Sequence, residues 1–138
     1  MTVTGRTVTP RVHWDAARRR LLVTYGTRAL SARREVVAAP ATVVLDGHGT
    51  ALDVDIKALP DRVSDALSRY AVSRRRPPRD GIALDVDAAW LWLHLAEGTA
   101  AQRLSGTARV RLVLDGTDVV EVEVALPPTT APTPGGSR

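Results

Sequence analysis

The sequence predicts an α+β fold that is mostly β, with two pseudo-symmetric three-stranded antiparallel meanders and one short helix between them. Three observations predict this fold: short apolar stretches that alternate with polar residues, an Asp-Gly turn in each half of the chain, and one segment with helical spacing. The chain of 138 residues is long enough for one compact domain. We therefore expect a single domain over residues 1–126, made of two repeats at 11–59 and 82–126.

The two repeats share apolar, acidic and turn residues in the same order, roughly 70 residues apart. Each unit opens with an apolar–Asp pair and an apolar strand, continues through an Asp-Gly turn, and closes with a strand in which carboxylates alternate with apolar residues. In the first unit these features are Trp14-Asp15, Leu21-Leu22-Val23, Asp46-Gly47-His48-Gly49 and Leu52-Asp53-Val54-Asp55-Ile56. In the second unit they are Leu84-Asp85, Leu91-Trp92-Leu93, Asp115-Gly116 and Val120-Glu121-Val122-Glu123-Val124.

The segment between the repeats differs from both of them. Val63, Leu67 and Tyr70 recur at helical spacing after a proline, which predicts a short amphipathic helix over 61–72. Arginines and two prolines follow, and they predict a stiff basic linker over 73–80. The last segment, 127–138, is rich in Pro, Thr and Gly and has no apolar face to bury, so we expect a disordered tail there.

The repeat unit resembles the DUF2283 family of small bacterial proteins of unknown function. That family has an aromatic-Asp start, a Leu-aromatic-Ile strand, and an Asp-x-x-Gly turn that leads into a Gly-Ile-Glu-Ile strand, which are matched by the features given above. This chain departs from the pattern at Leu22, where the family has an aromatic residue, and at Asp53 and Glu121, where it has glycine. The resemblance implies a β-meander plus helix, a fused pseudo-dimer, and no catalytic residues to carry over. Some members lie beside toxin-like genes, which implies an interaction role of the antitoxin kind.

Composition excludes several classes of protein. The chain has no cysteine, so disulfides and thiolate metal sites are ruled out and a cytoplasmic location is favoured. No run approaches the roughly 18 apolar residues of a membrane span. The polar first ten residues lack the apolar stretch of a signal peptide. We expect a cytoplasmic protein with no membrane partner.

No catalytic or metal-binding pattern stands out. The histidines, His13, His48 and His94, form no pair at helical spacing with another ligand, so no metal site and no cofactor are predicted. Asp53 and Asp55 form a same-face carboxylate pair, about 7 Å apart along a strand. Acid–base catalysis generally needs burial to shift such groups, and nothing in the sequence indicates it. We predict no catalytic residue.

The carboxylates of the second repeat have an evident structural partner. Strand alternation places Arg109 and Arg111 on the same outer face as Glu121 and Glu123. Cross-strand Arg–Glu pairs stabilise a sheet by roughly 0.2–1 kcal/mol each. The favoured interpretation of these charges is therefore a solvated salt-bridge ladder rather than a binding site.

Basic residues are nearly all arginine, and the net charge is +4. Arginine favours bidentate contacts with phosphate. The candidate phosphate contacts are Arg18, Arg19, Arg20, Arg74, Arg75 and Arg76. They suggest a basic nucleic-acid-associated module, although acidic residues are spread through the same chain and aromatic stacking platforms are few.

Trp90 and Trp92 share one face of a predicted strand, and Leu91 and Leu93 share the other. The leucines belong to the core, so the tryptophan pair needs separate cover. In one interpretation the predicted helix supplies this cover. In the other, the pair is a partner interface, where exposed tryptophan is common.

The favoured hypothesis is a non-enzymatic protein-interaction module that self-associates or binds another protein. A basic nucleic-acid-associated module is the first alternative, and a small β-barrel enzyme with a ligand pocket is the second.

Overall fold

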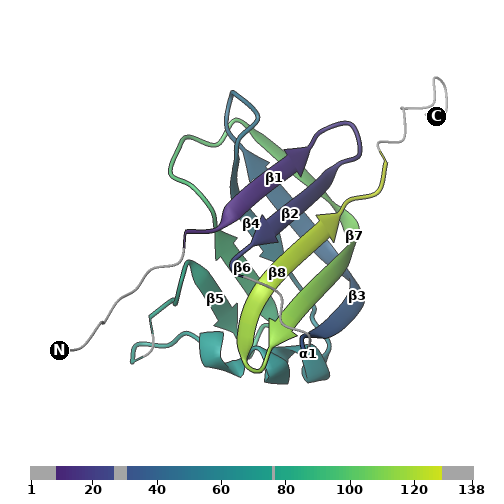
Figure 1. Ribbon diagram of the computed structural model, residues 1–138. Helices are drawn as coiled ribbons and strands as arrows, with labels where there is room; N and C mark the ends of the chain where they lie inside the picture. Colours follow the sequence, from purple (N-terminus) through teal and green to yellow (C-terminus); the bar gives the residue numbers. More distant parts are fainter. Residues whose placement is uncertain (1–8, 27–30, 76, 129–138) are drawn as a thin grey trace.

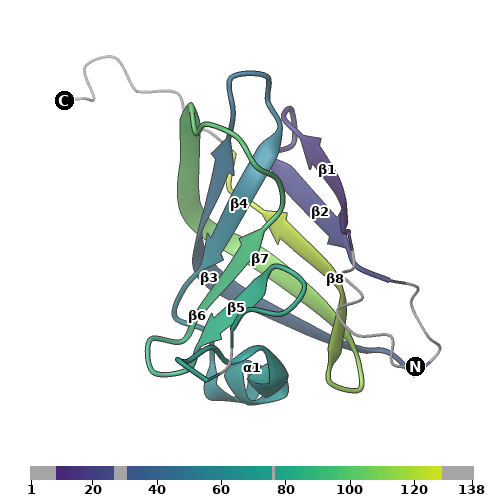
Figure 2. The same cartoon turned by 90° about the vertical axis from the view of Figure 1, so that its left-hand side faces the viewer.

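In the part of the chain that the structure describes, eight antiparallel strands form one sheet that curls round a common core (Figures 1 and 2). The computed structural model describes residues 9–26, 31–75 and 77–128. The strands are β1 (Arg11–Asp15), β2 (Arg20–Thr24), β3 (Arg33–Leu45), β4 (Ala51–Ile56), β5 (Ile82–Asp85), β6 (Trp90–His94), β7 (Gln102–Asp115) and β8 (Asp118–Ala125). Their order across the sheet is β1-β2-β8-β7-β3-β4-β6-β5. The prediction of a mostly β chain with one short helix is confirmed.

Hairpins, rather than three-stranded meanders, are the units of this sheet. The consecutive strands β1–β2, β3–β4, β5–β6 and β7–β8 each form a hairpin. β2 then pairs with β8, and β4 pairs with β6, so hairpins from the two halves of the chain interleave. The predicted meander within each half is therefore wrong. The reason is that β7 pairs with β3 along all 13 residues of β3. β7 thereby takes the edge of β3 that a meander would give to β2.

β3 passes through Pro40 without a break. Lys57 donates its backbone N–H to the Pro40 carbonyl at 2.9 Å, which places this carbonyl, and the missing N–H, on the β4 side of the strand. Regular pairing with β4 begins one residue later, where Ala41 lies opposite Ile56. The proline is tolerated because the ladder toward β4 has already ended at this position.

The inner face of the sheet is apolar in both halves, as the alternation of the strands predicts. The strand residues of this core that have no exposed surface are Leu21, Val23, Val43, Val54, Ile56, Leu84, Leu91, Leu93, Val110, Leu112, Leu114, Val122 and Val124. Packing of such side chains excludes water from the concave side of the sheet, and each contributes roughly 1.5–3 kcal/mol by burial. The outer face is left for polar residues and for any site.

Two β-bulges change which residues face the core. The pairing register shifts between Val44 and Leu45 and again between Val113 and Leu114. After the second shift, Leu114 lies opposite Val119, so Val119 joins the core cluster in place of Val120. After the first shift, Leu45 lies opposite Ala51, and the buried Leu52 is left outside the core cluster.

The helix α1 (Asp61–Ala66) and the 3-10 helix η1 (Ser68–Tyr70) lie at one end of the curled sheet (Figure 1). The predicted span of 61–72 is too long, because the α-helical part ends at Ala66. Val63, Leu67 and Tyr70 are buried in the core cluster. The Tyr70 hydroxyl accepts the Val119 backbone N–H at 2.8 Å, which ties η1 to the start of β8. Neither of these helices is long and apolar enough to cross a membrane.

The first hairpin of each half has the same turn. Asp15 Oδ1 accepts the backbone N–H of Arg18, and Asp85 Oδ1 accepts that of Ala88, both at 3.1 Å. The next residues, Arg19 and Ala89, have positive φ angles of 54° and 51°. Arg76 of the predicted linker, and residues 129–138 of the predicted tail, lie outside the described residues.

Candidate functional site

The tryptophan pair lies on the outer face of β6. Leu91 and Leu93 of the same strand are fully buried in the core, as strand alternation predicts. Trp90 is 38% exposed and Trp92 is half-buried. The helix does not cover them, since α1 packs on the end of the core through Val63. The interpretation in which the helix hides the tryptophan pair is therefore wrong.

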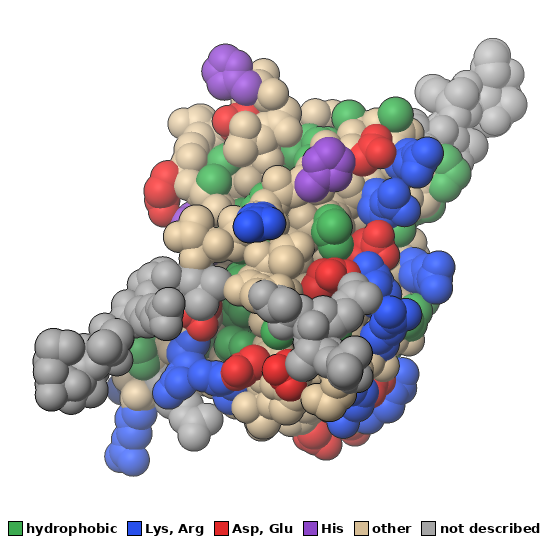
Figure 3. Space-filling view, in the orientation of Figure 1, with side chains coloured by type: hydrophobic (Ala, Val, Ile, Leu, Met, Phe, Trp, Pro, Cys, Tyr) green, Lys and Arg blue, Asp and Glu red, His purple; other side chains and the backbone are tan. Residues whose placement is uncertain are grey.

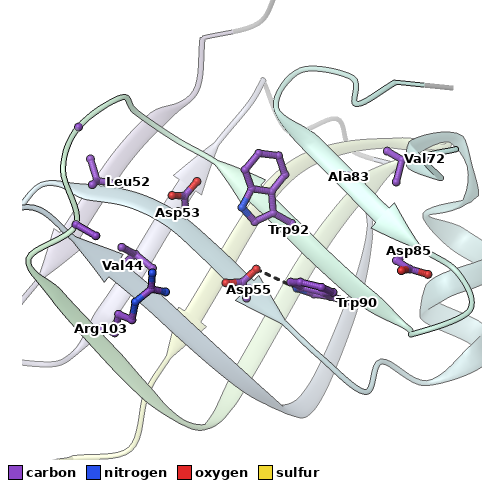
Figure 4. Close-up of a pocket in the computed structure, with 12 residues that line it drawn as sticks. Val44, Leu52, Asp53, Asp55, Val72, Ala83, Asp85, Trp90, Trp92 and Arg103 are labelled. Atoms are coloured by element: carbon purple, nitrogen blue, oxygen red, sulfur yellow. Dashed lines mark hydrogen bonds between the residues drawn. The ribbon is translucent and has the colours of Figure 1, made fainter. Parts of the chain in front are cut away.

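A cleft of about 530 Å³ lies on the outer face beside these two rings (Figure 4). We call it the Trp–Asp cleft. Its lining residues are Val44, Leu52, Asp53, Asp55, Val72, Ala83, Asp85, Trp90, Trp92, Gly98, Ala100 and Arg103. Strands β3 to β7 and the segments beside them supply these residues, so the cleft depends on chain segments from both halves of the molecule.

The connection between β6 and β7 forms one wall of the cleft. Leu95 and Ala96 donate their backbone N–H groups to the Leu52 carbonyl at 2.7 and 3.2 Å. Gly98 lies so close to Leu52 that a Cβ atom on it would come within 2.9 Å of the Leu52 Cδ2 atom. Because of the bulge beside it, Leu52 faces this connection instead of the core. The glycine thus lets the loop pack directly onto β4.

Asp55 and Trp90 form the centre of the cleft. The Trp90 indole N–H donates a hydrogen bond of 2.9 Å to Asp55 Oδ1 (Figure 4). The Lys57 ammonium lies 5.3 Å from the centroid of the Trp90 ring, a cation–π distance. The indole is thereby oriented by a carboxylate at its edge and attracts a cation to its face.

Asp53 belongs to a chain of polar groups that runs through His94. Asp53 Oδ1 lies 3.0 Å from His94 Nδ1, and Glu97 Oε2 lies 2.7 Å from His94 Nε2. The hydrogen bond with Asp53 raises the pKa of His94 above its ordinary value; partial burial opposes the rise, and Glu97 adds to it. The Trp92 ring stacks on the imidazole, with centroids 5.6 Å apart. This arrangement holds the Trp92 ring in place.

Asp85 and Arg103 lie toward opposite ends of the cleft (Figure 4). Asp85 uses Oδ1 to accept the Ala88 N–H of the β5–β6 turn. Val72 is held beside it, because the Val72 N–H donates to the Leu84 carbonyl at 3.0 Å. Arg103, on β7, is exposed and makes no ion pair within the described residues. The cleft therefore has an acidic end and a basic end.

The opposite outer face, on β2, β8 and β7, carries the predicted ion-pair ladder. Arg111 reaches Glu121 at 2.7 Å and Glu123 at 3.1 Å. Arg20 lies 3.6 Å from Glu123. Figure 3 shows basic and acidic side chains interspersed on this side of the molecule. The ladder that strand alternation predicts for Arg111 is confirmed.

The candidate phosphate contacts do not gather into one surface. Arg18 and Arg19 lie in the β1–β2 turn, whereas Arg74 and Arg75 follow η1 at the other end of the molecule (Figures 1 and 2). Arg18 is 3.9 Å from Asp15, and Arg19 Nε donates to the Pro127 carbonyl at 2.9 Å. Acidic partners and chain contacts thus occupy part of the first arginine cluster.

The other histidines lie apart from the cleft. His13 is on the edge strand β1, and His48 is in the β3–β4 turn, where its N–H donates to Asp46 Oδ1 at 2.8 Å. Backbone N–H groups of this turn lower the pKa of Asp46, those of Thr50 and His48 most. Among the described residues, no group of three or more His, Cys, Asp or Glu side chains is placed to hold a metal ion.

Comparison of the chain with protein-family models, with curated proteins and with solved structures found no match. The resemblance of the repeat unit to the DUF2283 family therefore stays a prediction.

Sequence reasoning found the tryptophan pair and the acidic face of β4 but did not bring them together. It missed Asp85, Arg103 and the wall at Gly98, which come from separate parts of the chain. The alignment of the two repeats could have indicated the site, since the second copy has Trp92 where the first has Leu22.

Proposed function

We propose that this chain is a non-enzymatic protein-interaction module and that the Trp–Asp cleft is its binding site. The observation that carries the proposal is the outward position of Trp90 and Trp92 beside an open cleft with three aspartates. Tryptophan supplies a large contact area at a small entropic cost and is enriched in the residues that dominate binding energy. A monomer in isolation gains nothing from leaving such rings partly exposed to water.

The polar groups of the cleft support binding over catalysis. Asp55, Asp53 and Asp85 are each held by a hydrogen bond to the protein, from Trp90, His94 and Ala88 respectively. Such fixed groups are suited to recognition, because little conformational entropy is lost when a partner docks. The lining within the described residues offers no hydroxyl or thiol nucleophile.

The two halves of the chain are, in this proposal, copies of one four-strand unit related by a pseudo-two-fold axis. When β1 to β4 are exchanged with β5 to β8, the strand order is the same read from the opposite edge of the sheet. The shared turns at Asp15 and Asp85 and the bulges after Val44 and Val113 support the same conclusion. A function that arose after duplication is expected where the copies differ, and the cleft is such a place.

A screen by two-dimensional NMR tests the proposed function. The full chain is titrated with a library of small acidic, neutral and basic fragments and blocked peptides. Compounds that bind the cleft shift the indole N–H signals of Trp90 and Trp92 and spare that of Trp14, which packs on the core. The proposal fails if no compound of any charge does so.

The variant Trp92→Leu is the matched negative control for binding to the cleft. Leucine already occupies the counterpart position, Leu22, so the scaffold accepts it. We expect the variant to fold and to lose the binding. Sedimentation of both proteins shows whether a second copy is the partner, because self-association through the cleft would be lost with Trp92.

A further inference from the structure

The Trp–Asp cleft is negatively charged, although the whole chain carries a net charge of +4. Three carboxylates, those of Asp53, Asp55 and Asp85, line it against the single guanidinium of Arg103. Charge of one sign gathered in a cleft attracts the opposite sign and raises its local concentration. The cleft therefore differs in sign from the molecule that carries it.

Each aspartate of the cleft keeps one oxygen for a partner. Asp55 and Asp85 use Oδ1 for Trp90 and for the Ala88 N–H, and within the described residues no hydrogen bond or ion pair occupies their Oδ2 atoms. A neutral ligand that covered these carboxylates would leave them desolvated without a compensating charge, which is costly. A cation would neutralise them and use the open oxygens.

The aromatic rings of the cleft favour the same chemistry. The Trp90 ring already has the Lys57 ammonium 5.3 Å from its centroid. Its N–H is committed to Asp55 and Lys57 lies over the ring, so a ligand meets the part of the π surface that Lys57 does not cover. Guanidinium groups stack on tryptophan faces and pair with carboxylates through two parallel hydrogen bonds, whereas an ammonium acts as a point charge.

We propose that the Trp–Asp cleft binds an arginine side chain presented by an extended segment of another protein. The guanidinium lies between the tryptophan faces and the open oxygens of Asp55 and Asp85, and Arg103 at the other end receives a backbone carbonyl of the segment. A volume of about 530 Å³ holds such a side chain with its adjoining backbone. This inference rests on the proposed function and names the chemistry of the partner.

Four blocked tripeptides test the inference against the full chain: acetyl-Gly-X-Gly-amide with X as arginine, lysine, citrulline or glutamate. Citrulline has the shape of arginine without its charge. The shifts of the Trp90 and Trp92 indole N–H signals are followed. We expect arginine to bind about tenfold more tightly than citrulline, lysine to fall between them, and glutamate to give no shift. The arginine affinity should fall as salt is raised.

The double variant Asp55→Asn with Asp85→Asn removes two charges and keeps the side-chain size. We expect it to weaken arginine binding at least about tenfold. Asp65→Asn, on the exposed side of α1, changes charge away from the cleft and should have little effect. Folding of each variant is checked from its whole NMR spectrum.

Several outcomes overturn the inference. Equal binding of arginine and citrulline, no shift with any tripeptide, or no effect of the double variant would each do so. A dimer that the double variant dissociates would assign the cleft to a second copy and would overturn the choice of another protein. Binding of neutral or acidic fragments in the screen keeps the proposed function while the arginine assignment fails, so the two failures are distinguishable.

Discussion

Two outer faces of the sheet, one on β8 and β2 and the other on β4 and β6, share the same strand register. They differ in the residues that surround their acidic side chains. Glu121 and Glu123 lie opposite Thr24 and Leu22, just as Asp53 and Asp55 lie opposite His94 and Trp92. On the third strand, Arg111 is opposite Glu123, whereas Thr42 is opposite Asp55. The diagonal neighbour is Arg20 in one case and Trp90 in the other.

These few exchanges turn an ion-pair ladder into an open site. Arg111 binds both of its glutamates, so that face is satisfied within the molecule. Thr42 instead hydrogen-bonds Ser105 at 2.8 Å and leaves Asp55 to the tryptophan. The comparison teaches that the carboxylate positions belong to the scaffold, while the residues beside them decide whether the acids are closed off or available.

The largest expected effect concerns the inner faces of β2 and β6. It tests whether these two faces contribute equally to stability, although their outer faces differ. Leu21→Ala and Leu91→Ala each remove a fully buried side chain from a matching position. Each should lower the free energy of unfolding by about 3 kcal/mol, within the usual range of roughly 2–5. Urea denaturation measures both. A cost confined to one half would break the equivalence.

The next effect concerns the sheet edge beside the cleft. Gly81 has a φ of +74°, and a Cβ atom on it would lie 2.8 Å from the backbone oxygen of His94. Gly81→Ala should therefore cost about 2 kcal/mol of folding stability. Gly47→Ala is the control, because it has open space around it and should change stability by less than about 0.5 kcal/mol. Equal costs would show that the close contact at Gly81 does not matter.

The ion-pair ladder should contribute less to the free energy of unfolding than either the backbone conformation at Gly81 or the buried core leucines. Arg111→Met removes one partner from each of Glu121 and Glu123, both largely buried, and should cost about 1–2 kcal/mol. Thr42→Val at the matching position removes a single neutral hydrogen bond and should cost about half as much. Chemical denaturation at low and high salt separates them, since only the Arg111 effect should shrink with salt. A larger cost at Thr42 would contradict the comparison.

The smallest expected effect is the dependence of folding stability on pH, which comes from His94 beside the cleft. The pKa of His94 is raised chiefly by Asp53, so the pairing stabilises the fold below the ordinary histidine pKa of about 6.5 and is lost as pH rises through the raised value. The stability difference between wild type and His94→Thr, which copies Thr24, should shrink over that range. An NMR titration of the imidazole should show a larger fall in the His94 pKa for Asp53→Asn than for Glu97→Gln. The reverse order would contradict this assignment.

Much of the strand content could be predicted from alternation and turns, but less of the site could. The apolar–acidic pattern identified the outer positions of Asp53, Asp55 and Arg111, and the Asp-Gly pairs marked two hairpins. Alternation misjudged Leu52, because a bulge one strand away moved it off the core and into the cleft. Asp85 stands out in the sequence only as the start of the second repeat, because its part in the cleft depends on strands that approach only in three dimensions.

Away from the two bulges, the sequence by itself determined which side chains face inward and outward on a strand. It also determined where the Asp-Gly turns fall and that tryptophan replaces an ordinary strand residue in one half only. These properties follow from the two-residue period of a strand and from local turn chemistry. The tertiary structure alone decided that β3 pairs with β7, that α1 caps the core instead of the tryptophans, and that Asp53, Asp55, Asp85 and Arg103 share one cleft. Pairing between distant strands depends on competing registers and on burial of the whole core, and no local stretch of residues encodes that choice.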